Sequence, residues 1–387
     1  MREQTSRCGS VHANVVAMNG WSRWVTEQLD AVRSAGRWRA TRAFDANGAR
    51  GELDGQPVIS YASNDYLGLS THPRVLAAAH DAIDRWGAGS TASRLVVGSR
   101  PCHAELESEI AVWKGTDRAL VYPTGYAANL GVLGVFGGPD VTVYSDELSH
   151  ASLIDGCRLS RSTVRVYRHG DVEHLETLLA ADSGARQIVV TDGVFSMDGD
   201  EAPLPEIAAA CAQHGALLVV DEAHAVLSPH LAEVEAQNVI HVGTLSKSLG
   251  TLGGWVAARA PYVDLLVNRS RPFIFTTALS PADTAGALAA LAVLRSEEGA
   301  RLIVRLRAAI DAVAPGHPSP IVPIVLGDED RALKASAALL ERGIFVPAIR
   351  PPTVPVGTSR LRIALSAGHT DAMLAELVAG LEAIGVQ

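Results

Sequence analysis

The middle of the chain alternates short apolar runs with longer segments in which apolar residues recur every three or four positions. Near-continuous apolar runs are typical of strands buried on both faces, and a period of 3.6 residues is typical of amphipathic helices. The runs lie at residues 119–122, 141–144, 164–167, 187–191, 216–220 and 239–242. This alternation predicts an α/β fold with a mostly parallel sheet covered by helices.

Helices are also expected before this region. Apolar residues at helical spacing from Trp21 to Val32 predict an amphipathic helix near the N-terminus. A second helix is expected from Pro73 to Trp86 and a third over residues 103–114. Between them, residues 87–100 are rich in Gly, Ser and Thr and are expected to form a loop.

The pattern changes near Pro281, where a long Ala- and Leu-rich helix is expected over residues 282–294. Shorter apolar runs and helical patterns follow, which predicts a smaller α/β unit. We therefore expect an N-terminal helix and arm over residues 1–60, a large domain over 61–281 and a small C-terminal domain over 282–387.

Composition narrows the function classes. The 387 residues are 48% hydrophobic and 19% charged, as in folded globular proteins. The net charge of −9 and the lack of a basic cluster with aromatic residues argue against nucleic-acid binding. No apolar run suggests a signal core or a membrane span, so we expect a cytoplasmic protein without a membrane partner. Translation could start at Met1 or at Met18.

The cysteines do not suggest a disulfide framework or a metal site. They are Cys8, Cys102, Cys157 and Cys211, with no CxxC pair and no histidine at ligand spacing. We expect reduced thiols and no bound metal.

Ligands of parallel α/β sheets bind beyond the carboxyl ends of the strands, so the residues after each apolar run are candidates. Asp221 and His224 follow the run at 216–220. A carboxylate at the end of a buried strand costs several kcal/mol unless it is paired or hydrogen-bonded. Asp221 is therefore either a helix N-cap or the partner of a cationic heterocycle such as protonated pyridoxal 5′-phosphate (PLP). His224 either faces the same pocket or is structural.

Three other strand ends carry candidates. Thr124-Gly125-Tyr126 opens a predicted helix, whose backbone N–H groups could bind a phosphate, although an ordinary strand-to-helix turn also fits. His150 could stack on a planar ring or cap a helix. Ser196 lies in a polar loop over residues 192–200, which a simple turn would also explain.

Lys247 differs from the other two lysines of the chain. Lys114 and Lys334 lie in helical patterns and are expected to be solvated. Lys247 instead follows the run at 239–242, in a turn of small and hydroxyl residues. An amine that forms an imine needs a pocket and partial desolvation. Lys247 alone could be an exposed turn residue, but the candidates at the other strand ends together favour a reactive lysine.

Five motifs together resemble the α-oxoamine synthases, a family of fold-type-I PLP enzymes that condense an amino acid with an acyl thioester. The motifs lie at residues 63–69, 148–152, 191–199, 221–224 and 244–250. The resemblance extends from Trp21 to the C-terminus and implies PLP as cofactor and a homodimer. Residues 349–362 are most similar to members that join L-alanine to pimeloyl-CoA or a pimeloyl carrier protein in biotin biosynthesis.

The resemblance also implies roles for single residues. Lys247 would bind PLP as a Schiff base and move the Cα proton, Asp221 would pair with the ring nitrogen, and His150 would stack on the ring. His224 and Ser196 would lie near the phenolic oxygen. The phosphate end would be bound by Thr124, Gly125, Tyr126 and Thr244, and by Thr276 and Thr277 across a dimer interface. The substrate side would be lined by Arg39, Asn64, Thr353 and Arg362.

The chain departs from the family pattern after His224. A Gly-rich loop is usual there, whereas this chain continues Ala225-Val226-Leu227-Ser228-Pro229-His230, and the stretch before Lys247 is several residues short. The departure affects a loop near the expected site entrance. Two alternatives therefore stay open: a related synthase that uses glycine or serine with another acyl group, or a PLP-fold binding protein that has lost turnover.

Overall fold

The computed structural model describes residues 19–182, 186–227 and 238–386. The possible start at Met18 and residues 228–230 of the altered loop lie outside these ranges. The chain divides into two compact units, residues 1–44 and 45–387, and each is described by itself. In the described residues no helix combines the length and the apolar character that crossing a membrane requires.

The first unit contains the predicted N-terminal helix, α1 (Gly20–Ser34). Its N-cap is Asn19, whose side-chain oxygen accepts a hydrogen bond from the Ser22 N–H at 2.9 Å. None of the residues of α1 is buried, and the rings of Trp21 and Trp24 pack edge to face on its surface.

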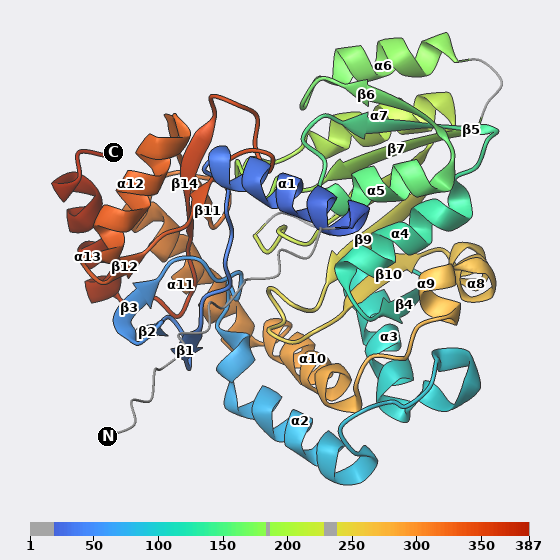
Figure 1. Ribbon diagram of the computed structural model, residues 1–387. Coiled ribbons are helices and arrows are strands. Elements are labelled where there is room, and N and C mark those ends of the chain that lie inside the picture. The colour runs from blue at the N-terminus through green and yellow to red at the C-terminus, as the bar shows by residue number, and fades with distance from the viewer. Residues whose placement is uncertain (1–18, 183–185, 228–237, 387) are drawn as a thin grey trace, which may run out of the picture. The chain divides into compact units, whose positions relative to one another are not determined.

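A seven-stranded sheet forms the centre of the second unit (Figure 1). Its order is β4-β10-β9-β8-β7-β5-β6, and all neighbours pair in parallel except β10, which is antiparallel to β4 and to β9. The strands are β4 (Arg118–Tyr122), β5 (Val141–Asp146), β6 (Thr163–Tyr167), β7 (Arg186–Asp192), β8 (Leu217–Asp221), β9 (Val239–Thr244) and β10 (Gly254–Ala258). The prediction of a mostly parallel sheet is confirmed, and β10 is an additional strand.

Helices cover both faces of this sheet because successive strand residues point to opposite sides. Val190 packs with Leu133 and Leu153 on one face, whereas its neighbour Val189 packs with Leu175 and Ile207 on the other. The helices of this unit are α2 (Pro73–Trp86), α3 (Pro101–Lys114), α4 (Gly125–Phe136), α5 (Ala151–Ser160), α6 (Val172–Ala181), α7 (Leu204–His214), α8 (Ala260–Arg269), α9 (Arg271–Ile274), α10 (Pro281–Leu294), α11 (Glu297–Val313), α12 (Glu329–Leu340) and α13 (Asp371–Ala383).

Two smaller sheets accompany the C-terminal helices. One has the order β11-β14-β13, and in the other a C-terminal strand, β12, pairs in parallel with β3. Their strands are β1 (Phe44–Ala46), β2 (Arg50–Leu53), β3 (Gln56–Ser60), β11 (Ile321–Gly327), β12 (Ile344–Phe345), β13 (Ala348–Ile349) and β14 (Ser359–Ala364). A smaller C-terminal α/β unit is thus present, whereas the domain limits at residues 60 and 281 stay a prediction.

The expected loop over residues 87–100 is not irregular throughout, because residues 94–98 form a π-helical turn, η2 (Arg94–Gly98). The Arg94 guanidinium fixes this turn by donating from Nη1 and Nη2 to both carboxylate oxygens of Glu107 on α3, at 2.7 and 3.0 Å. Side-chain pairing across the segment therefore gives it a defined conformation.

The expectation that Lys114 is solvated is wrong. Its side chain is only 6% exposed and forms an ion pair with Glu222, which directly follows β8. The ammonium lies 4.0 Å from the ring centroid of Trp113, and His241 of β9 contacts the second oxygen of Glu222 at 2.6 Å. Burial alone would raise the pKa of Glu222, but the nearby Lys114 and His241 outweigh this effect and lower the pKa to about 2. The ion pair with Glu222, which is distant in the sequence, therefore stabilises Lys114 in a buried position.

This pair generates a stability prediction. Lys114→Met should lower the free energy of unfolding by about 3 kcal/mol at pH 7, because it leaves the Glu222 carboxylate buried with only His241 as a partner. The folded pKa of Glu222 is below its ordinary value of 4.5, so its contribution is present above that pH and is lost as the pH falls towards 2. Urea denaturation at pH 7 and pH 4 measures both effects. Lys334→Met, at an exposed position, is the control, and equal stability of the two variants would contradict the prediction.

Candidate active site

The carboxyl ends of β7, β8 and β9 bring three polar side chains to one edge of the large sheet. Asp192 ends β7 and pairs in register with Asp221, which ends β8. Lys247 follows Thr244, the last residue of β9. These side chains border a cavity of about 220 Å³. Eight of the predicted site residues line it: Thr124, Gly125, Tyr126, His150, Asp221, His224, Thr244 and Lys247.

Lys247 is partly buried, and within the described residues its amine forms no hydrogen bond or ion pair. Burial lowers the pKa of the amine, while Asp221 and Asp192 oppose this shift. The turn that presents it ends at Gly250, which has a φ of 65° and where a Cβ would lie 2.3 Å from the Ser70 nitrogen. The chain thus offers an amine that is easier to deprotonate than an ordinary lysine.

Asp221 is held by two hydrogen bonds. Its Oδ1 accepts from the Ala223 backbone N–H at 2.9 Å, and its Oδ2 accepts from the Asn129 amide at 2.6 Å. The side chain is buried, with 6% exposure, and forms no ion pair within the described part of the chain. The site therefore offers a fixed, buried carboxylate to a cationic group.

His150 is connected to the same amide. Asn129 Nδ2 also donates to Ser152 Oγ at 2.8 Å, and Ser152 Oγ lies 2.7 Å from His150 Nδ1. Nδ1 further accepts from the Ser152 backbone N–H at 3.3 Å, so the neutral ring carries its proton on Nε2. Burial lowers the pKa of His150, although the Asp221 carboxylate opposes this shift. The lowered pKa favours the neutral form.

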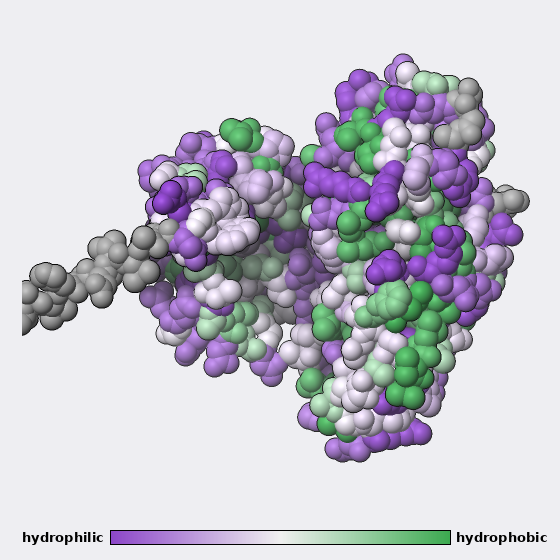
Figure 2. Space-filling view, turned by 45° about the vertical axis from the view of Figure 1, so that its right-hand side comes forward, coloured by the Kyte–Doolittle hydropathy of each residue, from purple (hydrophilic) through white to green (hydrophobic). Residues whose placement is uncertain are grey.

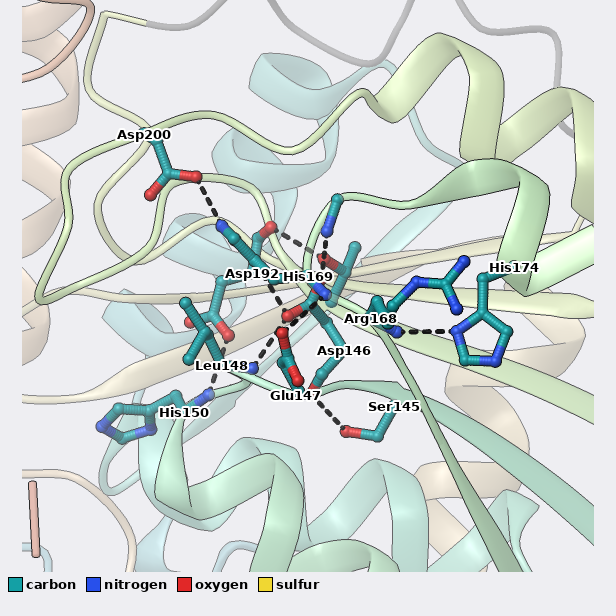
Figure 3. Close-up of polar contacts among 12 residues, drawn as sticks. Ser145, Asp146, Glu147, Leu148, His150, Arg168, His169, His174, Asp192 and Asp200 are labelled. Atoms are coloured by element: carbon teal, nitrogen blue, oxygen red, sulfur yellow. Dashed lines mark hydrogen bonds and ion pairs between the residues drawn. The ribbon is translucent and has the colours of Figure 1, made fainter. Parts of the chain in front are cut away.

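The His150 backbone is anchored on Asp192, whose Oδ2 accepts from the His150 N–H at 2.8 Å (Figure 3). Burial raises the pKa of Asp192 well above its ordinary value, and the nearby Asp221 carboxylate raises it further. Two carboxylates side by side in a buried site do not both ionise easily. Asp192 thus fixes His150, and its carboxyl group retains a proton more readily than an ordinary aspartate.

His224 and Arg362 are linked through Asn64. The Tyr66 hydroxyl lies 2.6 Å from His224 Nδ1 and donates to Asn64 Oδ1 at 3.1 Å. Arg362 of β14 donates from Nη2 to the same Asn64 oxygen at 3.2 Å and from Nε to the Ser196 carbonyl at 2.6 Å. Burial lowers the pKa of His224 well below its ordinary value, so its ring is neutral.

Arg362 is 5% exposed and has no carboxylate partner among the described residues. A buried guanidinium without an anion is costly, so an anionic group of a ligand would stabilise it. Ser196 contributes its carbonyl here, and the predicted role of its hydroxyl stays a prediction.

The first turn of α4 forms another wall of the cavity. The N-cap Thr124 accepts from the Ala127 N–H at 3.0 Å, which leaves the amides of Gly125 and Tyr126 directed out of the helix start. Gly125 is close to β9, because a Cβ there would lie 3.2 Å from the Thr244 Cβ. Thr244 Oγ1 and Ser246 Oγ, 2.7 Å apart, add hydroxyl groups. This arrangement suits a phosphate.

Seven predicted residues do not line this cavity. Asn64, Ser196 and Arg362 belong to the hydrogen-bond network described above, and the other four are exposed. Thr276 and Thr277 are exposed after α9, and Thr353 is exposed before β14. Arg39 is exposed in the first unit, separate from the unit that contains the cavity. Their expected roles stay predictions.

Four residues of the site were not predicted from the sequence: Asn129, Ser152, Asp192 and Tyr66. Asn129 lies four residues after Gly125 and thus on the same face of α4, which was a usable signal. Asp192 follows the run at 187–191 just as Asp221 follows its own strand. The contact of Tyr66 with His224 spans 158 positions, and no local pattern indicates it.

With this sheet and this cavity, the chain has the fold of the fold-type-I PLP-dependent transferases. The chain belongs to the family described as aminotransferase class I and II, which matches residues 56–381.

The individual proteins that this chain resembles have names more specific than the family description. The chain is 49% identical to the 8-amino-7-oxononanoate synthase of Anaeromyxobacter dehalogenans, over 93% of this chain and 95% of the relative. Among solved structures it resembles the serine palmitoyltransferase of S. paucimobilis with bound PLP–myriocin aldimine, with 30% identity, a TM-score of 0.87 and coverage of 95% and 100% of the two chains. The 8-amino-7-oxononanoate synthase of Francisella tularensis matches with 26% identity, a TM-score of 0.69 and coverage of 84% and 96%.

Proposed function

We propose that the protein is a PLP-dependent acyltransferase that condenses L-alanine with a pimeloyl thioester to give 8-amino-7-oxononanoate for biotin biosynthesis. The observation that supports it most is the free Lys247 amine beside the fixed Asp221 carboxylate at the sheet edge. The name of the relative that is 49% identical supplies the product.

The residues of the cavity fit PLP. Lys247 would bind its aldehyde carbon, Asp221 its ring nitrogen, and the start of α4 with Thr244 its phosphate. The buried Asp221 without an ion pair is explained by a protonated ring nitrogen. His150 would contact the ring face, and His224 would lie near the phenolic oxygen. When bound, PLP accepts electrons from the bonds at the Cα atom of the amino acid.

Different side chains of the protein would then bind the substrate and transfer protons. Arg362 binds the alanine carboxylate, for which a planar guanidinium is well suited, and Asn64 orients it. Lys247, with its lowered pKa, takes the proton from Cα and later returns one. The Nε2–H of His150 donates to the acyl carbonyl oxygen during C–C bond formation, after which the thiol and CO2 leave. Thr353 and Arg39 would complete the substrate side.

A homodimer is part of this proposal. Leu95, Val96 and Val97 of η2 and Phe275 after α9 are large hydrophobic residues with exposures of 54% to 73%. Ser93 and Thr277 form a β-bridge that joins these two segments. Figure 2 shows hydrophobic residues gathered on the visible face of the molecule. A second copy would cover such residues and would bring Thr276 and Thr277 to the phosphate of its partner.

A second candidate is favoured by the structural comparison. The serine palmitoyltransferase has the higher TM-score of the two solved structures, 0.87 against 0.69. The protein would then use serine or glycine with a different acyl thioester. The identity of 49% to an 8-amino-7-oxononanoate synthase, against 30%, is the reason to place this candidate second.

The assignment predicts a substrate preference. Protein supplied with PLP, L-alanine and pimeloyl-CoA should release thiol and form the amino ketone, detected by a thiol reagent and mass spectrometry. The same protein with L-serine or glycine and palmitoyl-CoA should turn over at least tenfold more slowly, a difference of about 1.4 kcal/mol in transition-state binding. Turnover of serine with palmitoyl-CoA, and not of alanine with any pimeloyl thioester, would establish the second candidate instead.

The reactive lysine generates a spectroscopic prediction. Lys247→Ala should abolish the visible absorption of PLP attached to the protein, because no other described lysine reaches the cavity. Lys334→Ala, a matched change at an exposed position, should leave the band unchanged. A visible spectrum after incubation with PLP and removal of the excess measures it. A band that persists in the Lys247 variant would refute the assignment of this residue.

A further inference from the structure

His169 is the second residue after β6, and carboxylates bind both of its ring nitrogens (Figure 3). Nδ1 donates to Asp146 Oδ1 at 3.0 Å, and Nε2 donates to Asp200 Oδ2 at 2.7 Å. A neutral imidazole donates from only one nitrogen, so this geometry requires the imidazolium form. The edge-to-face contact with Phe195, with ring centroids 4.3 Å apart, fixes the plane of the ring.

Asp146 connects His169 to the turn that leads to His150. It ends β5, and its carboxylate accepts from the backbone N–H groups of Leu148 at 2.8 Å and Gly170 at 2.9 Å. The Ser149 N–H adds a bond to the Asp146 carbonyl, and Asp192 anchors His150 independently. The turn before His150 thus has several anchors besides His169.

Asp200 connects His169 to the loop over residues 193–201, which binds both arginines of β14. The Ser196 carbonyl accepts from Arg362, and Asp198 forms an ion pair with Arg360. Asp200 also closes the loop through its carbonyl, which accepts from the Phe195 N–H at 3.0 Å. His169 is therefore a bridge from the end of β5 to the loop on which Arg362 rests.

We propose that charged His169 is a positioning residue that sets the place of the Ser196 carbonyl, and through it of Arg362, relative to the sheet edge. The proposal rests on the proposed function, in which Arg362 binds the amino-acid carboxylate. The loss of the bridge should weaken amino-acid binding more than it slows the chemical steps, because Arg362 binds the carboxylate from the first binding step until CO2 leaves, whereas His150 keeps its other anchors.

The charges around His169 determine how the bridge responds to pH. Asp146 and Glu147 face it from the end of β5, the latter accepting the His169 backbone N–H, and Asp200 faces it from the loop. On its own side, Arg168 pairs with Asp171, and the Arg168 N–H donates to His174 Nδ1. Hydrogen bonds to Asp146 and Asp200 raise the pKa of His169 to about 10. Its stabilising contribution is complete below its ordinary value of 6.5 and is lost as the pH rises through about 10.

The kinetic test compares His169→Gln with His174→Gln. Glutamine at position 169 lacks the charge and cannot donate to both carboxylates in the same geometry. We expect the KM for L-alanine to rise roughly tenfold and kcat to fall less than about threefold in His169→Gln. His174 lies beyond Arg168 in Figure 3 and contacts neither Asp146 nor Asp200. His174→Gln should therefore match the wild type. An unchanged KM in His169→Gln, or the same rise in both variants, would overturn the proposal.

Two measurements that do not depend on turnover test the same proposal. The difference in Tm between the wild type and His169→Gln, without added PLP, should be larger at pH 6 than at pH 10.5, and a constant difference would count against the charged bridge. Asp200→Asn, at a side chain that is 44% exposed, keeps an acceptor but removes the charge and should weaken alanine binding in the same direction.

Calorimetric titration with L-alanine in the presence of PLP separates the two proposals. If the wild type neither binds nor turns over alanine, the proposed function fails. If the wild type binds alanine and both His169→Gln and Asp200→Asn bind it equally well, only the role of His169 is refuted.

Discussion

The pairing register of β7, β8 and β9 is the constraint on which the site depends. It places the carboxylates of Asp192 and Asp221 side by side and brings the turn with Lys247 to the same edge. A slip by one residue would turn each of these side chains to the opposite face of the sheet. Two adjacent buried carboxylates are costly, and the structure offsets that cost with donors from other elements, chiefly Asn129 of α4 and the backbone of His150.

Several ionisable groups of the cavity have pKa values shifted towards their neutral forms. Burial lowers the pKa of Lys247, His150 and His224 and raises that of Asp192. An amine must be unprotonated to attack a carbonyl carbon or to remove a proton, so the shift of Lys247 favours both tasks. The neutral histidines can contact a ring or donate one hydrogen bond without adding charge. Burial thus prepares the same edge of the sheet for covalent and for acid–base chemistry.

Much of the large sheet could be predicted from the sequence because its strands are continuous apolar runs, which are a local signal. β10 was not predicted, because Gly254–Ala258 consists largely of Gly and Ala, which are uncommon in strands, and follows a glycine-rich turn. Lys114 was misjudged for a different reason: its partner Glu222 is 108 positions away, and a helical pattern does not reveal a buried ion pair. The candidates after each strand were found by position, whereas Asn129 and Tyr66 act through tertiary contacts.

The two sets of site residues have different structural origins. Those suited to the cofactor come from the ends of strands within one sheet and from α4, and the sheet register fixes their separations. Arg362 comes from β14 in a separate sheet, and it meets the large sheet through the Ser196 carbonyl and Asn64. Changes in the loop over residues 193–201 can therefore alter the position of Arg362 without disturbing Lys247 and Asp221.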